Sequence, residues 1–211
     1  MKSQIFSLFA ATSVVLLANS AQASTFYSSS FESDQGGWSE SGDWERGIPT
    51  GFTGGFSSVE PSGGFSGDFA FGTVIGGDHS PSTISSLTQT FDFSGLTDVS
   101  LSFYEWIESG SNAFDEAKVF VGSTEVYFSD GDSNSDWRLV SLDLSAFDNQ
   151  SDVSIEFQFS STSVVERVGW YIDDVKISAA DTNPTPVPEP VSTAALFGLA
   201  GVSLVTARKR K

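Results

Sequence analysis

Val153-Ser154-Ile155-Glu156-Phe157-Gln158-Phe159 places apolar and polar side chains at strictly alternating positions. In an extended chain this alternation puts the apolar side chains on one face and the polar side chains on the other. A period of two is typical of a half-buried β-strand. The segment therefore predicts a strand with one face in a core and the other in water.

The same pattern recurs along the chain, with Gly, Ser, Asp and Asn between the repeats. Strands are predicted at residues 25–32, 87–93, 99–106, 117–121, 139–144 and 170–177, and a short strand near 69–74. Residues 47–86 are rich in Gly, Ser and Phe and are otherwise predicted to be a long loop packed on the core. Short half-buried strands separated by turn residues predict an all-β fold, an antiparallel two-sheet β-sandwich.

The charge of the chain excludes several classes of partner. Its 211 residues include 27 Asp and Glu against 10 Lys and Arg, a formal charge of −17. An acidic surface repels phosphate backbones and anionic lipids, which excludes nucleic acids and membrane surfaces as partners of the body. Cysteine is absent and His79 is the only histidine, so thiolate sites and sites with two imidazoles are also excluded.

Residues 1–23 have the features of a secretory signal peptide. Lys2 is followed by an apolar run from Ile5 to Ala18 and by the small-residue exit Ala21-Gln22-Ala23. These features predict export through the inner membrane and cleavage after Ala23. The β-sandwich domain is then expected at residues 24–181.

The C-terminal end combines a spacer, an apolar stretch and a basic tail. Residues 182–190 are Pro-rich and include Val187-Pro188-Glu189-Pro190, whereas residues 191–211 run from an uncharged stretch into Arg208-Lys209-Arg210-Lys211. This order predicts one transmembrane helix with a cytoplasmic tail. It also resembles the PEP-CTERM sorting signal, which implies recognition by an exosortase and sorting to the cell surface or beyond. The alternative is a plain membrane anchor.

The body resembles the MAM-like and carbohydrate-binding-module-like jelly rolls of exported bacterial proteins. The motifs that carry this resemblance occur in order along the chain: Ser30-Phe31-Glu32, Gly37-Trp38, Asp43-Trp44-Glu45-Arg46-Gly47, Phe71-Gly72-Thr73, Leu101-Ser102-Phe103-Tyr104-Glu105-Trp106, Trp137 with Leu142-Asp143-Leu144-Ser145, and Gly169-Trp170-Tyr171-Ile172-Asp173-Asp174-Val175. The resemblance implies a two-sheet sandwich with adjacent terminal strands. It also implies adhesion or glycan binding rather than catalysis.

Similar jelly rolls hold a structural Ca²⁺ between the first and last strands. The matching carboxylates here are Glu32 and Asp173, with Asp174 and Asp34 as helpers. Ca²⁺ takes six to eight oxygen ligands, which carboxylates and carbonyls supply. In the strand pattern Asp173 shares a face with Tyr171, Val175 and Ile177, so it needs an ion or a partner if it is buried. The alternative is that Asp173 accepts backbone N–H bonds.

A second acidic segment, Asp130-Gly131-Asp132-Ser133-Asn134-Ser135-Asp136, has oxygens at alternate positions, like the start of a Ca²⁺ loop. It has Ser135 where such a loop needs Gly, and Ser141 where it needs Glu. A polar hairpin loop is therefore the preferred interpretation.

Sugar rings stack on aromatic faces, so each tryptophan is a candidate ligand platform. Trp106 and Trp170 are expected to lie partly in the core. Trp44, flanked by Asp43 and Glu45, is the preferred candidate for glycan binding, because the carboxylates can accept bonds from sugar hydroxyls.

Catalytic motifs are weak. Glu105 with Glu108 could act as an acid pair of a glycosidase, and His79 beside Ser80 could imitate a triad, but no G-x-S-x-G elbow supports the latter. The sequence therefore predicts a non-catalytic, exported surface or matrix protein that binds extracellular polysaccharide, adheres or builds biofilm. The alternative is a secreted glycan-active hydrolase.

Overall fold

A computed structural model describes residues 23–110, 113–129 and 134–181. This part of the chain is almost entirely β-structure. The strands are β1 Ser24–Ser29, β2 Ser39–Ser41, β3 Trp44–Gly47, β4 Ala70–Thr73, β5 Ile84–Phe91, β6 Leu96–Glu108, β7 Glu116–Val121, β8 Thr124–Phe128, β9 Asn134–Asp143, β10 Val153–Ser160 and β11 Gly169–Asp181. Two 3-10 turns, η1 Gly55–Ser57 and η2 Ser145–Phe147, complete the description. Within the described residues no helix is long and apolar enough to cross a bilayer.

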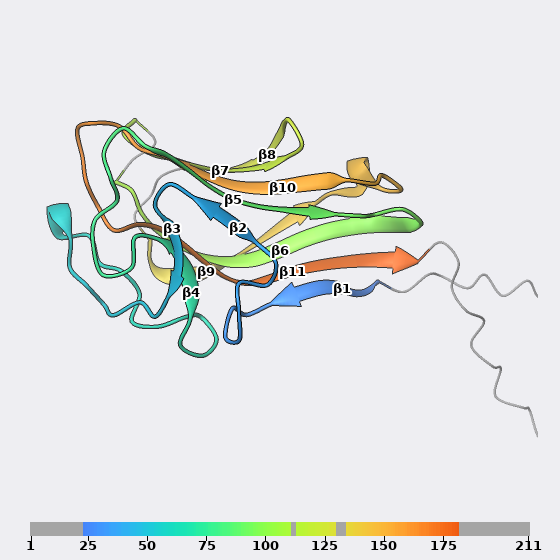
Figure 1. Cartoon of the computed structure of the whole chain (residues 1–211), viewed down its shortest axis with the longest axis horizontal. Coiled ribbons are helices and arrows are strands. Elements are labelled where there is room, and N and C mark those ends of the chain that lie inside the picture. Colours follow the sequence, from blue (N-terminus) through green and yellow to red (C-terminus); the bar gives the residue numbers. More distant parts are fainter. Residues whose placement is uncertain (1–22, 111–112, 130–133, 182–211) are drawn as a thin grey trace, which may run out of the picture.

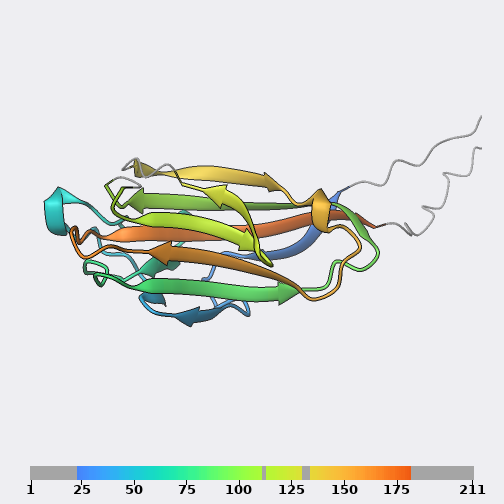
Figure 2. The same cartoon turned by 90° about the horizontal axis from the view of Figure 1, so that it is seen from above.

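Two antiparallel sheets pack face to face as a sandwich (Figures 1 and 2). The six-stranded sheet has the order β3-β4-β11-β6-β9, and β1 pairs with the same edge of β11 that β4 uses. The five-stranded sheet has the order β2-β5-β10-β7-β8. Ser24 at the start of β1 pairs with Ala179 near the end of β11, so the described chain enters and leaves at one end of the sandwich. The predicted all-β antiparallel sandwich is confirmed.

The core lies between the sheets and is dominated by aromatic rings. Phe157 on β10 lies 4.9 Å from Phe103, 5.3 Å from Trp38 and 5.7 Å from Trp170, measured between ring centroids. The alternating burial of β10 matches its alternating sequence along the whole strand. Burial of such large rings stabilises the fold through apolar area removed from water and through edge-to-face contacts.

Carboxylates hold the long connections to this core by accepting backbone N–H bonds. Glu60, only 1% exposed, accepts bonds from Thr50 N at 2.7 Å and Gly76 N at 2.8 Å. Asp78 accepts a bond from Gly55 N, which fixes the tip of the loop between β3 and β4. Much of the acidity of the sequence therefore serves the internal structure of loops, since a buried N–H must find an acceptor.

The predicted signal peptide and the predicted sorting signal, with Val187-Pro188-Glu189-Pro190, lie outside the described residues. So does most of the acidic segment 130–136.

Candidate functional site

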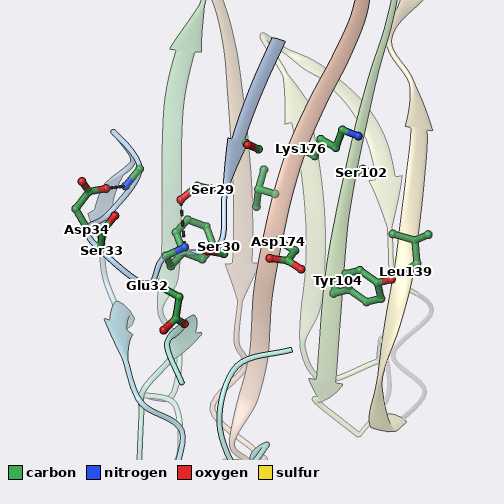
Figure 3. A pocket seen from close by; sticks show the side chains of 14 residues that line it. Ser29, Ser30, Glu32, Ser33, Asp34, Ser102, Tyr104, Leu139, Asp174 and Lys176 are labelled. Atoms are coloured by element: carbon green, nitrogen blue, oxygen red, sulfur yellow. Dashed lines mark hydrogen bonds between the residues drawn. The ribbon is translucent and has the colours of Figure 1, made fainter. Parts of the chain in front are cut away.

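The outer face of the six-stranded sheet carries a groove of about 490 Å³. Its walls come from the end of β1 and the following turn, and its floor comes from β6, β9 and β11 (Figure 3). Three carboxylates reach it: Glu32, Asp34 and Asp174. Tyr104 and Leu139 form its apolar side, and Leu139 is 57% exposed.

A break in the edge of the sheet creates this groove. β4 pairs with residues 171–172 of β11 and β1 pairs with residues 175–179, so the two short strands leave a gap along the same edge. Between them β11 carries a bulge at Asp173–Lys176, where Asp174 has a φ of 48°. A bulge re-aims side chains and bends the strand, which here turns Asp174 toward the groove.

The bulge corrects the expected orientation of Asp173. Sequence alternation predicts that Asp173 lies on the same face as Val175 and Ile177. Val175 and Ile177 lie in the core, whereas Asp173 pairs with Tyr104 on the outer face of the sheet. The extra residue in the strand reverses the alternation at that point.

An aromatic cluster adjoins the groove. Phe65 stacks on Tyr104, with centroids 3.4 Å apart and an interplanar angle of 11°. Trp137 lies 6.5 Å from Phe65 and 6.2 Å from Trp106. Phe65 is 41% exposed, so these four residues, named the aromatic cluster below, present apolar surface to solvent beside polar groups.

Phe65 is held in place by a loop that the carboxylates clamp. Glu32 Oε1 accepts bonds from Asp68 N at 3.0 Å and Phe69 N at 2.8 Å. Asp173 Oδ2 accepts a bond from Ser66 N at 3.0 Å, and Asp174 Oδ1 accepts one from Ser66 Oγ at 2.7 Å. The three carboxylates predicted as Ca²⁺ ligands thus converge on one loop, residues 62–69, which is named the clamped loop below.

Asp173 is the buried member of these three acids, whereas Glu32 is exposed. Asp173 is fully buried, and burial raises the pKa of its carboxyl to about 7 despite the bonds from Ser66 and Asp174. Oxygen donors are what Ca²⁺ takes, so Glu32 and Asp173 fit such an ion chemically. However, N–H groups face their oxygens, and the described residues hold no group of three or more His, Asp or Glu side chains arranged for a metal. The alternative interpretation, that Asp173 accepts backbone N–H bonds, describes the observed contacts.

The structure places the predicted glycan-binding residues Trp44, Asp43 and Glu45 at the core and at two loops. Trp44 is 2% exposed and lies 5.5 Å from Trp170 in the core, so neither of its faces is open to a sugar. Its neighbours serve loops: Asp43 accepts a bond from Ser80 N at 2.6 Å and Glu45 one from Ile75 N at 2.6 Å. The expectation of a platform at Trp44 is corrected by this burial.

Two of the candidate catalytic residues, Glu105 and His79, are engaged in the interior, whereas Ser80 is exposed. Glu105 is fully buried and accepts bonds from Arg138 Nε at 2.5 Å, Tyr127 Oη at 2.7 Å and Trp170 Nε1 at 2.9 Å. His79 is 1% exposed, and its Nε2 lies 3.3 Å from Asp115 Oδ2. Burial alone would lower the pKa of His79, but the attraction of Asp115 outweighs it, so that the pKa is raised.

No protein-family model matches the sequence. The chain is 28% identical over 177 residues to Bacillopeptidase F of Bacillus subtilis (strain 168), an alignment that covers 75% of this chain and 11% of that protein. The chain therefore spans about a tenth of the length of the curated relative it matches.

Two solved structures illustrate the similarity of the fold. The CBM22-1 xylan-binding domain from Paenibacillus barcinonensis Xyn10C is 15% identical with a TM-score of 0.49, covering 78% of this chain and 99% of that one. The K1 cleaved adhesin domain of Lys-gingipain from Porphyromonas gingivalis W83 is 16% identical with a TM-score of 0.48, covering 73% and 97%. The described body is a two-sheet antiparallel β-sandwich.

Sequence reasoning did not single out Tyr104, Phe65 or Leu139. Tyr104 occupies an outward position of a strand whose alternating neighbours Phe103 and Glu105 are buried. An aromatic residue at the polar positions of an alternating strand is the signal that could have identified it. Phe65 lies in a loop, and only the folded chain shows which strand that loop covers.

Proposed function

We propose that this protein is a non-catalytic, exported surface or matrix protein that binds extracellular polysaccharide through the groove and the aromatic cluster. The observation that carries this proposal is that the groove and the aromatic cluster are continuous, because Tyr104 belongs to both. The apolar faces of sugar rings stack on aromatic rings, while carboxylates accept bonds from sugar hydroxyls. The groove offers both kinds of contact within one site.

Two features of the site support binding without catalysis. At the clamped loop Glu32 Oε1 and Asp173 Oδ2 accept backbone N–H bonds, and the buried Glu105 is paired with Arg138. A general acid or base must be within reach of a substrate proton, and Glu105 is sealed from the outer face. Release of reducing sugar from the bound polymer would contradict this part of the proposal and favour the hydrolase.

Binding is tested by co-sedimentation and affinity electrophoresis of the protein with xylan, β-1,4-galactan and a β-glucan. Tyr104→Ala is expected to weaken retention by about tenfold, a loss of about 1.4 kcal/mol. Ile84→Ala is the matched control, since Ile84 is 68% exposed on the other sheet. Equal loss in both variants, or no retention of the unmodified protein, would count against a glycan site on this face.

We also propose Ca²⁺ as a structural ion at Glu32 and Asp173, completed by backbone carbonyls. Support comes from the buried carboxylate of Asp173, whose ionisation a divalent cation would favour. Ca²⁺ is expected to raise the Tm and EDTA to lower it, and Asp173→Asn is expected to remove the response. An unchanged Tm in every condition would oppose the ion without affecting the proposed polysaccharide site.

We propose from the sequence that an exosortase recognises the C-terminal tail after export and sorts the protein to the cell surface or beyond. Mass spectrometry of the mature protein from its native host tests it. A C-terminus upstream of residue 191 supports sorting with removal of the tail, and an intact tail supports the plain membrane anchor instead.

A further inference from the structure

A second hollow lies on the same face as the groove. It has a volume of about 330 Å³ and is lined by β6 and β9 together with the start of the turn at η2. Ser100, Ser141 and Asp143 are the residues of this hollow that face outward beside the groove residue Ser102. The two hollows are therefore two parts of one outer surface.

Strand register shows that the hollows adjoin. Tyr104 pairs with Leu139, Ser102 with Ser141 and Ser100 with Asp143, in three successive cross-strand rows. The first row and Ser102 belong to the groove, and Ser141 and the third row belong to the second hollow. From Tyr104 to Ser100 the face extends for about 13 Å at about 3.3 Å per residue. That length exceeds a single sugar ring.

Short hydroxyl side chains line this face beyond Tyr104. Ser100 and Ser102 are half-buried and Ser141 is exposed, so none of them blocks the path between the hollows. The hydroxyls of Ser102 and Ser141 can donate and accept hydrogen bonds, as the hydroxyls of a sugar do. Ser100 Oγ donates to the carbonyl of Ser178 at 3.4 Å and offers the polymer an acceptor. Tyr104 and Leu139 supply the apolar end of the same path. The combination fits an elongated, hydroxyl-rich polymer.

The charge along the path is negative. Asp174 and Glu32 line the groove, Asp98 and Asp143 line the second hollow, and Lys176 is the one cation among the lining residues of either hollow. Carboxylates repel a polymer that carries uronate or sulfate groups, whereas they accept bonds from neutral hydroxyls. The electrostatics therefore favour an uncharged chain.

We infer that the outer face of the six-stranded sheet binds the interior of a neutral polysaccharide, extended along β6 and β9 from the groove to the second hollow. The inference rests on the proposed function and adds the polymer class, its direction and the residues that it crosses. The linings of the two hollows are contiguous along β6 and β9, so we expect the affinity to depend on occupying both.

The test is calorimetry of the protein with xylan oligosaccharides of increasing length, with their reducing ends either free or reduced to alditols. Affinity is expected to rise with length until both hollows are filled and to be unchanged by end reduction. Ser141→Gln places a neutral, bulky side chain between the hollows. This variant is expected to weaken the binding of long oligosaccharides by about tenfold and to leave the affinity for the shortest ones unchanged. Ser141→Ala is the control for loss of the hydroxyl alone.

The outcomes separate this inference from the proposed function. Binding that is independent of length and of Ser141→Gln, yet is weakened by Tyr104→Ala, would overturn the extended track and leave the polysaccharide site standing. Polygalacturonate bound as tightly as xylan would overturn the preference for neutral chains. Absence of binding to xylan, galactan and β-glucan alike would overturn both proposals.

Discussion

The indole N–H of Trp170 donates a 2.9 Å hydrogen bond to Oε2 of Glu105 in the centre of the sandwich. The other carboxylate oxygen accepts bonds from Arg138 and Tyr127, so three elements meet at one buried acid. Burial and the nearby negative charge of Glu105 raise the pKa of the Tyr127 hydroxyl well above its usual range. Tyr127 therefore remains a hydrogen-bond donor to Glu105 at every physiological pH.

Removing this carboxylate is expected to be costly. Glu105→Ala leaves the Trp170 N–H without its acceptor and removes the ion pair with Arg138, and it should lower the free energy of unfolding by about 3 kcal/mol. This loss lies at the low end of the range for breaking a buried ion pair, because the Arg138 side chain is 35% exposed and solvent screens its charge. Urea denaturation measures it, with Glu125→Ala as an exposed-acid control expected to change stability by less than about 0.5 kcal/mol. Equal effects of the two variants would contradict the network.

The clamped loop gives a second prediction. Gly67 has a φ of 75°, and a Cβ there would lie 2.5 Å from the Glu32 carboxylate carbon. Gly122 has a φ of 58° in the turn between β7 and β8, and a Cβ there would have nothing within 4 Å. Both Ala variants carry the left-handed backbone cost of about 1–2 kcal/mol, but only Gly67→Ala also displaces the Glu32 carboxylate.

Gly67→Ala should therefore have a lower Tm than Gly122→Ala in thermal unfolding. Because Glu32 holds the loop that carries Phe65, Gly67→Ala should also weaken polysaccharide binding, whereas Gly122→Ala should leave it unchanged. Identical Tm values and affinities for the two variants would show that the loop does not depend on Glu32.

The alternating segments predict their own strands well. β10 has the alternating burial that Val153–Phe159 implies, and the alternating part of β6 is equally regular. Period-two patterning works here because one face of each strand is in the core and the other in water. These local patterns were sufficient for the fold class.

The site depends on features that local pattern does not encode. The bulge at Asp173–Lys176 depends on how β11 meets β1, β4 and the clamped loop, so the orientation of Asp173 could not be read from alternation. Trp44 lies in the core because the short strand β3 pairs with β4 at the edge of the sheet, a contact between segments about 30 residues apart. The residue types of a ligand site were present at Trp44, but its side chain faces inward.

His79 predicts a pH dependence of stability. Its pKa is raised in the folded protein, so the folded state binds the proton more tightly than the unfolded state does. The contribution is fully present below the unfolded pKa of about 6.5 and is lost as pH rises through the folded pKa. The stability difference between the unmodified protein and His79→Gln should therefore be larger at low pH than at high pH.

Urea denaturation of both proteins between about pH 5.5 and about pH 9 measures that difference. Taking the difference cancels the titration of the acids that the two proteins share. Asp115→Asn should abolish most of the pH dependence, because Asp115 is the partner that raises the pKa of His79. A difference that stays constant with pH, or grows with it, would contradict the pairing.

Trp44 and Trp170 provide a matched pair for the value of one buried hydrogen bond. Both are 2% exposed or less, and Trp44 Nε1 has no hydrogen-bond partner within the part of the chain that the structure describes. Trp170→Phe loses the bond to the Glu105 carboxylate and leaves that oxygen under-satisfied, whereas Trp44→Phe removes an N–H that was already unpaired. Since both changes remove the same atoms, Trp170→Phe should lower the free energy of unfolding by about 1.5–3 kcal/mol more than Trp44→Phe does.

Urea denaturation measures the two losses of stability. Polysaccharide binding should be unchanged by Trp44→Phe, because that ring is buried. A Trp44→Phe variant that keeps its stability but loses polysaccharide binding would indicate that Trp44 contacts the ligand. It would contradict the proposed polysaccharide site on the outer face of the six-stranded sheet.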